Sequence, residues 1–190
     1  MIPGILTEAE QVLLLKYARQ ALEHAVNGQK PPSLDLDSLP PRFQEPGATF
    51  VTLTRMGELR GCIGALDAYQ PLVEDVMEHA ITAALQDYRF PPVCPEELSH
   101  ICIEISHLTP PKRMDYEEPE ELLQKLRPCI DGVVLKDGRR RATFLPQVWE
   151  KLPDPGLFLS YLCHKMGANP ELWRSKKLEV YTYQVEKFHE

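Results

Sequence analysis

The chain has 190 residues, of which 43% are hydrophobic and 26% are charged, so the composition is that of a globular protein and excludes a disordered or fibrous one. This length suffices for one well-formed core, or for one core with a small appended lobe, and is short for two independent domains. We therefore predict a single domain over residues 1–190.

The chain is acidic, with 28 Asp and Glu against 21 Lys and Arg and a formal net charge of -7 at pH 7. This balance opposes long-range attraction to phosphate, so nucleic-acid binding is not expected. The N-terminal residues show no basic region followed by an apolar run, and no stretch approaches the roughly 20 apolar residues of a membrane span. We expect a cytoplasmic protein that does not bind membranes.

The five cysteines are odd in number, well separated, and form no C-x-x-C pair. Neither a disulfide framework nor a zinc ribbon is indicated by this spacing. The sequence therefore predicts reduced thiols, with no metal site and no cofactor. The cysteines are Cys62, Cys94, Cys102, Cys129 and Cys163.

The first predicted helix begins at Thr7, which forms a capping-box pattern with Glu10. Its apolar residues recur at helical spacing, and they are Val12, Leu15, Ala18, Leu22 and Val26. The stretch that follows, around residues 28–47, is rich in proline and polar residues and is predicted to be a flexible surface connection.

In the middle of the chain, the sequence predicts a hairpin, a helix and a strand. β-branched and aromatic residues on both sides of Met56-Gly57 predict an antiparallel hairpin over residues 48–66. A long amphipathic helix is predicted from Pro71 to about Tyr88, because the prolines that follow cannot continue a helical backbone. Residues 100–108 alternate strictly between apolar and polar, which predicts a half-buried strand.

The last third of the chain again mixes helices and strands. The predicted elements are a short acidic helix at 117–127, a hairpin around Asp137-Gly138, a helix that begins at Pro146, a helix at 156–166 stopped by Gly167, and a final strand at 178–188. Helices and antiparallel hairpins occur without regular βαβ spacing, which favours an α+β fold.

The segment Leu59-Arg60-Gly61-Cys62-Ile63-Gly64 lies on the second strand of the first predicted hairpin. If that strand is regular, Arg60 and Cys62 project to the same side, about 6.5 to 7 Å apart. A guanidinium near a thiol favours the reactive thiolate, while Gly61 and Gly64 let a ligand or another chain approach the backbone. Alternatively, Cys62 is a small buried hydrophobe and the glycines serve tight strand packing.

Asp87 and Arg89 flank Tyr88 at the end of the predicted long helix. An arginine there can bind the free carbonyls of the last turn and complement the helix dipole. The functional alternative is that Asp87 orients Arg60 or acts as a base near Cys62, which requires the helix end to fold against the hairpin.

Four segments of the chain occur in the order found in the AMMECR domain family. They are Leu59 to Gly64, Asp87-Tyr88-Arg89-Phe90-Pro91-Pro92-Val93, Glu104-Ile105-Ser106, and Ala142-Thr143-Phe144-Leu145-Pro146-Gln147-Val148. The chain resembles this family over nearly its whole length. The family is named from a chromosomal region linked to Alport syndrome, midface hypoplasia and elliptocytosis, and its prokaryotic members are described as protein A of the AmmeMemoRadiSam system.

The resemblance implies an α+β fold with an antiparallel sheet and flanking helices in a larger lobe, and a smaller lobe beside it. It implies a Memo-type protein and a radical S-adenosylmethionine protein as partners, and a shared cleft at which Arg60, Cys62, Asp87 and Arg89 meet. It names no reaction.

Two functions follow as hypotheses. The first is a binding or accessory module that presents the region around Arg60 and Cys62, with Gly61, Gly64 and Arg89, to a partner or ligand. The second is a thiol-dependent enzyme in which Cys62 is the nucleophile or redox centre and Asp87 orients the site. Whether the protein is an enzyme stays open on the sequence alone.

Overall fold

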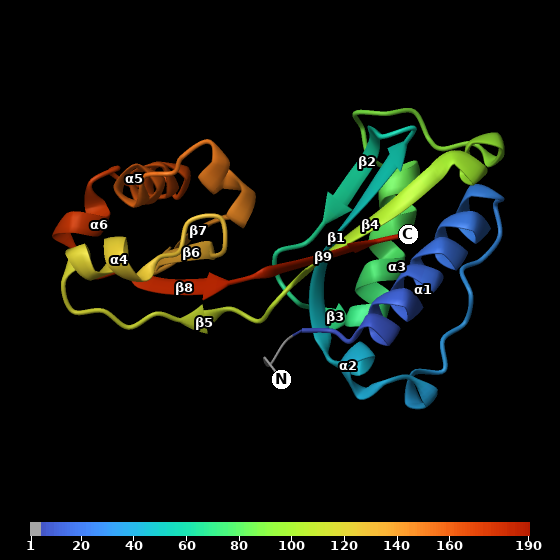
Figure 1. Cartoon of the computed structure of the whole chain (residues 1–190), viewed down its shortest axis with the longest axis horizontal. Coiled ribbons are helices and arrows are strands. Elements are labelled where there is room, and N and C mark those ends of the chain that lie inside the picture. The colour runs from blue at the N-terminus through green and yellow to red at the C-terminus, as the bar shows by residue number, and fades with distance from the viewer. Residues whose placement is uncertain (1–4) are drawn as a thin grey trace. The chain divides into compact units, whose positions relative to one another are not determined.

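A computed structural model describes residues 5–190, and in it the chain forms two compact units. Unit 1 comprises the chain up to Leu108 together with Glu186–Glu190, and unit 2 comprises Thr109–Val185. Each unit encloses a hydrophobic core of its own. The units correspond to the larger and smaller lobes of an α+β fold (Figure 1).

The helical elements of unit 1 are α1 (Glu8–Val26), the 3₁₀ helix η1 (Leu36–Ser38), α2 (Pro41–Gln44), α3 (Leu72–Leu85) and the 3₁₀ helix η2 (Pro95–His100). The capping box of α1 is confirmed, because the Thr7 hydroxyl accepts from the Glu10 backbone N–H and the Glu10 carboxylate accepts from the Thr7 backbone N–H. Of the apolar residues at helical spacing, Leu15, Ala18 and Leu22 are buried, whereas Val12 is 63% exposed. The buried arc of α1 is centred near Ala18, and Val12 lies about 120° from that centre.

The strands of the first sheet are β1 (Pro46–Arg55), β2 (Glu58–Gly64), β3 (Gln70–Pro71), β4 (Ile101–Leu108) and β9 (Val185–His189). They are ordered β2-β1-β4-β9, with β3 paired to the start of β1. β1 pairs antiparallel with β2, so the predicted hairpin is confirmed. The segment predicted as an irregular connection contains α2 and the first residues of β1, because Phe43 is fully buried and anchors it to the core.

Helices α1 and α3 lie side by side on one face of this sheet (Figure 1). Val51 and Leu53 of β1 and Ile103 and Ile105 of β4 are completely buried in the core. The alternation predicted for β4 is therefore confirmed from Ile101 to Ile105, whereas the next three residues, Ser106 to Leu108, are all buried. α3 ends at Leu85, three residues before the predicted end, and the chain then turns before it reaches the two prolines.

Unit 2 contains the strands β5 (Lys112–Arg113), β6 (Gly132–Asp137), β7 (Arg140–Phe144) and β8 (Glu179–Tyr183), in the antiparallel order β5-β8-β6-β7. Its helical elements are α4 (Pro119–Lys125), the 3₁₀ helix η3 (Pro146–Glu150), α5 (Pro155–Lys165) and α6 (Leu172–Ser175). In the core, the indole of Trp149 stacks on the ring of Phe158 with the ring centroids 3.7 Å apart. Among the described residues, every helix is too short or too polar to cross a bilayer.

The single strand predicted at residues 178–188 is wrong, because this segment forms β8 and β9 in two different sheets. The chain leaves the second sheet at Gln184. Its backbone N–H donates to the Thr109 hydroxyl, and its carbonyl accepts from the Thr109 backbone N–H. The two connections between the units are thus paired with each other.

Candidate functional site

The strand that carries the segment 59–64 is interrupted at Arg60. β2 pairs with β1 in register from Gly64 to Gly61, and a bulge then leaves Arg60 as an additional residue, because Gly61 faces Leu53 and Leu59 faces Thr54. A bulge redirects the side chain of the extra residue. The regular strand that would place Arg60 beside Cys62 is therefore absent at this point of β2.

Gly61 and Gly64 both have a packing role. A Cβ atom at Gly61 would lie 2.2 Å from the carbonyl oxygen of Ala83, and one at Gly64 would lie 2.4 Å from the carbonyl oxygen of Thr49. Gly61 thus faces α3, and because strand side chains alternate, the side chain of Cys62 points to the opposite face of the sheet. There the hydroxyl of Thr52, the register partner of Cys62 on β1, donates to its Sγ at 3.3 Å.

Asp87 and Arg89 bind the backbone of Cys62. Asp87 is 4% exposed, and its Oδ2 accepts from the Cys62 backbone N–H at 2.9 Å. Arg89 donates to Asp87 from Nε at 2.9 Å and from Nη2 at 2.6 Å, and Nη2 also donates to the Cys62 carbonyl at 3.1 Å. The end of α3 therefore does fold against the hairpin.

The charge on Asp87 is fixed by these contacts. The Arg89 guanidinium, with the backbone N–H groups of Cys62 and Arg89, holds the pKa of Asp87 well below its usual range despite the opposing effect of burial. Asp87 is thus an ionised acceptor engaged with a guanidinium and two backbone donors. Its hydrogen bonds in the structure go to these groups rather than to the Cys62 thiol or to Arg60.

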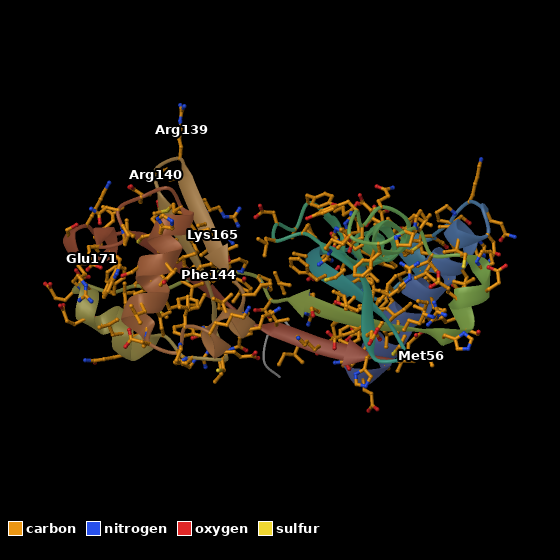
Figure 2. All side chains as sticks on the ribbon, turned by 90° about the horizontal axis from the view of Figure 1, so that it is seen from above. Met56, Arg139, Arg140, Phe144, Lys165 and Glu171 are labelled. Atoms are coloured by element: carbon orange, nitrogen blue, oxygen red, sulfur yellow. The ribbon has the colours of Figure 1, made fainter. Side chains whose placement is uncertain are left out.

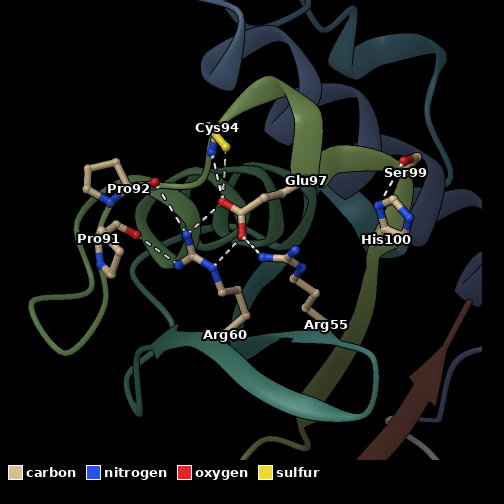
Figure 3. Close-up of polar contacts among 8 residues, drawn as sticks. All are labelled: Arg55, Arg60, Pro91, Pro92, Cys94, Glu97, Ser99 and His100. Atoms are coloured by element: carbon tan, nitrogen blue, oxygen red, sulfur yellow. Dashed lines mark hydrogen bonds and ion pairs between the residues drawn. The ribbon is translucent and has the colours of Figure 1, made fainter.

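Glu97 is the carboxylate that orients Arg60 (Figure 3). Nε of Arg60 donates to Oε1 of Glu97 at 3.0 Å, and Nη2 donates to Oε2 at 2.9 Å. Arg60 also donates from Nη1 to the Pro91 carbonyl at 2.8 Å and from Nη2 to the Pro92 carbonyl at 3.3 Å. The Arg60 side chain is only 12% exposed, and its guanidinium is engaged at all three nitrogens.

The pairing with Arg60 lowers the pKa of Glu97 to about 2, and Glu97 in turn raises the pKa of Arg60. Glu97 also accepts from Nη1 of Arg55 at 3.0 Å and from the Cys94 backbone N–H at 3.1 Å. Sequence reasoning did not identify Glu97 as a site residue. The sequence did contain one signal for it. Glu97 stands two residues after Pro95, a proline suited to the first helical turn, and a Glu at this position can accept from the backbone N–H of the N-cap residue.

β2 is an edge strand, and the segment 87–92 covers its edge. Asp87 and Arg89 bind the backbone at Cys62, while the carbonyls of Pro91 and Pro92 bind the side chain of Arg60. An uncovered edge strand is a template for pairing with another chain. The two segments that stood out in the sequence, 59–64 and 87–93, therefore lie together. The first forms the edge strand, and residues 87–92 of the second cover that edge.

Tyr88 stands at the centre of this turn and is 94% exposed. The turn is closed by a hydrogen bond of 3.0 Å from the Phe90 backbone N–H to the Asp87 carbonyl. Asp87 and Arg89, on either side, are fixed to Cys62. Sequence reasoning treated Tyr88 only as a spacer, although a large aromatic side chain between two charged residues was visible there.

The pocket nearest Arg60 lies at the end of the hairpin. Its volume is about 420 Å³, and it is lined by Arg55, Met56, Glu58, Leu59 and Arg60. Within residues 5–190, the hydrogen-bond partner of the Cys62 thiol is the Thr52 hydroxyl, and no three His, Cys, Asp or Glu side chains are grouped so as to hold a metal ion.

Comparisons with known proteins agree with this fold. The model of the AMMECR1 family matches residues 15–188. A protein of Methanothermobacter thermautotrophicus is 40% identical over 186 residues, which cover 97% of this chain and 96% of that protein. Protein MJ0810 of Methanocaldococcus jannaschii is 36% identical over 193 residues, covering 98% of this chain and 92% of its own length.

The crystal structure of the uncharacterised protein PH0010 from Pyrococcus horikoshii has the same α+β fold, with a TM-score of 0.77 and 34% sequence identity. The match covers 97% of this chain and 93% of that one. This chain belongs to the AMMECR1 family.

Proposed function

We propose that this protein is a binding or accessory module that acts with a Memo-type protein, a radical S-adenosylmethionine protein, or both. Its contact surface is the covered edge of β2, made by Arg60 to Gly64 and by the turn Asp87–Phe90. The proposal rests on the hydrogen bonds of Arg60 and Asp87, which go to groups of the same chain. Residues engaged in this way are suited to stabilising the shape of a surface.

Tyr88 is the anchor of this surface. A tyrosine offers a large apolar ring and a hydroxyl with few rotatable bonds, and such residues dominate the binding energy of many interfaces. Its turn is held at both flanks, so little backbone freedom is lost when a partner binds. Among the described residues Nη1 of Arg89 has no hydrogen-bond partner, which leaves one charged donor on the residue that follows Tyr88.

Calorimetric titration with the purified Memo-type and radical S-adenosylmethionine proteins of the same genome tests the proposal. Tyr88→Ala is expected to weaken binding of one of them at least tenfold, because it removes the exposed anchor and leaves the turn intact. Tyr69→Ala is the matched control, since Tyr69 is an exposed tyrosine elsewhere in unit 1. Absence of wild-type binding to both proteins, or equal losses for the two variants, contradicts the proposal.

The second candidate function is a thiol-dependent enzyme, and one contact favours it. The Thr52 hydroxyl donates to Cys62 Sγ at 3.3 Å and so holds in one orientation the sulfur atom that would attack a substrate. Alkylation by iodoacetamide near neutral pH, followed for each cysteine by mass spectrometry, tests this function. An activated Cys62 reacts at least tenfold faster than a model thiol, whereas a rate equal to or below that of the model thiol rules the function out.

A further inference from the structure

Helix α1 carries an apolar side chain on its exposed face. Val12 is 63% exposed and lines a surface pocket of about 600 Å³. The pocket is formed along α1 by Glu8, Ala9, Val12, Leu13 and Lys16. A β-branched side chain also lowers helix propensity, so an unbranched residue would suit an exposed helical position better. Neither burial within residues 5–190 nor helix propensity explains a valine at this position.

Two opposite charges flank Val12 at equal spacing. Glu8 precedes it by four residues and Lys16 follows it by four, so all three lie on one face of α1. Both charged side chains are exposed, and within residues 5–190 neither forms a hydrogen bond or an ion pair. They lie about 12 Å apart along the helix axis, which is too far for them to pair with each other. Both charges are therefore available to another molecule.

A second copy of the chain offers the matching arrangement. When two α1 helices lie antiparallel about a two-fold axis at Val12, Glu8 of each copy faces Lys16 of the other. The two Val12 side chains then meet on the axis, and the small side chain of Ala9 lets the helices approach closely. A parallel pair would instead bring like charges together. The spacing of the two charges about Val12 thus favours an antiparallel, self-complementary contact.

We propose that this face of α1, made by Glu8, Ala9, Val12 and Lys16, is the interface of an antiparallel dimer of the chain. A contact through one helix of each copy is smaller than the roughly 1,200 Å² at which stable interfaces begin. The net charge of -7 on each copy also opposes association at long range. The dimer is therefore weak and reversible. The inference goes beyond the proposed function, because none of these residues belongs to the surface at Tyr88.

Sedimentation velocity of the full chain, from about 10 μM to about 1 mM, covers the range expected for a weak interface. The wild type is expected to shift from monomer towards dimer as its concentration rises. Lys16→Glu makes all four charges at the interface negative, and Glu8→Lys makes all four positive. Each variant is expected to weaken dimerisation at least tenfold, because the two attractive pairs become repulsive.

An equimolar mixture of Lys16→Glu and Glu8→Lys is expected to form dimers again, because each chain then meets only opposite charges on the other. This recovery tests the pairing itself, since a variant that had lost its fold would not be rescued by the other. A wild type that stays monomeric at every concentration overturns the inference. A mixture that is no more dimeric than either variant alone overturns it as well.

Val12→Asp provides the second measurement, because it places two carboxylates together on the axis. It is expected to weaken dimerisation at least tenfold. Met56→Asp is the matched control: Met56 is 86% exposed at the end of the β1–β2 hairpin (Figure 2), and its positive φ angle suits aspartate. This control is expected to dimerise within twofold of wild type. Dimerisation of Val12→Asp equal to that of wild type overturns the interface, whereas Tyr88-dependent partner binding is measured separately and decides the proposed function.

Discussion

Glu97 holds Arg60 through two hydrogen bonds, and the guanidinium lowers the pKa of this carboxyl from 4.5 to about 2. Because the folded pKa lies below the unfolded one, the stabilising contribution is fully present above about pH 4.5. It is lost as the pH falls through about 2. The ion pair therefore makes the fold of unit 1 sensitive to acid in that window.

Glu97→Gln is expected to lower the free energy of unfolding at pH 7 by about 2 kcal/mol, because a buried guanidinium loses its charged acceptor. The difference from the wild type should shrink as the pH is lowered from 5 towards 2. Urea unfolding at a series of pH values measures this. Glu104→Gln, which affects only an exposed pair with Lys187, is the control. A difference between Glu97→Gln and wild type that does not change with pH contradicts the account.

At the residue scale, the sequence singled out Arg60, Cys62, Asp87 and Arg89 as candidates but could not show what each side chain contacts. Asp87 and Arg89 do contact Cys62, through its backbone, whereas Arg60, which the resemblance placed at the same cleft, binds Glu97 instead. The partner of Arg60 could not be found from spacing, because the bulge at Arg60 depends on the register between β1 and β2. Glu97 lies 37 residues away in the chain, and only the fold brings it to Arg60.

At the scale of secondary-structure elements, the edge of β2 is covered by side chains instead of by another strand. Pro91 and Pro92 lack the N–H groups that a strand would need, and their carbonyls accept from Arg60. The Cys62 N–H and carbonyl are bound by Asp87 and Arg89. This arrangement protects the edge from pairing with other chains and keeps Tyr88 exposed.

Asp87→Asn is expected to speed hydrogen exchange of the Cys62 amide by roughly 10- to 100-fold, because a hydrogen bond to a charged acceptor contributes about 1.5–3 kcal/mol. The Leu53 amide, on the interior strand β1, serves as the control and should change little. Two-dimensional NMR of amide exchange measures both. An unchanged rate at Cys62 would show that Asp87 does not protect this edge.

The elements that depend only on residues close together in the chain could be predicted from the sequence. The Thr7–Glu10 capping box, the hairpin with the turn at Met56 and the alternation over the first five residues of β4 are set by neighbouring residues, and these three are confirmed. The division of residues 178–188 between two sheets could not be predicted, because alternation continues through Gln184. The division depends on the pairing of Gln184 with Thr109, 75 residues away.

On the scale of the whole molecule, the two units have separate cores, and both tryptophans of the chain, Trp149 and Trp173, are buried in the core of unit 2. Tryptophan fluorescence therefore reports on unit 2, whereas far-ultraviolet circular dichroism reports on both units. Proteins with two cores need not unfold in one transition.

Gly61→Ala is expected to destabilise unit 1 by about 1–3 kcal/mol, because the new Cβ would collide with the Ala83 carbonyl. The circular dichroism transition should shift to lower urea concentration, while the midpoint of tryptophan fluorescence stays in place. Gly156→Ala, in α5 of unit 2, is the control and should affect unit 2 alone. Equal shifts of both signals in Gly61→Ala would show that the two units unfold together.

We infer that the surface around Cys62 acts by binding and not through the chemistry of its thiol. Calorimetric titration of the Cys62→Ser variant with the partner that the wild type binds separates these two roles. We expect an affinity within twofold of wild type, because the backbone contacts with Asp87 and Arg89 remain, alongside at least a tenfold loss in Tyr88→Ala. A tenfold loss in Cys62→Ser with no loss in Tyr88→Ala would contradict it.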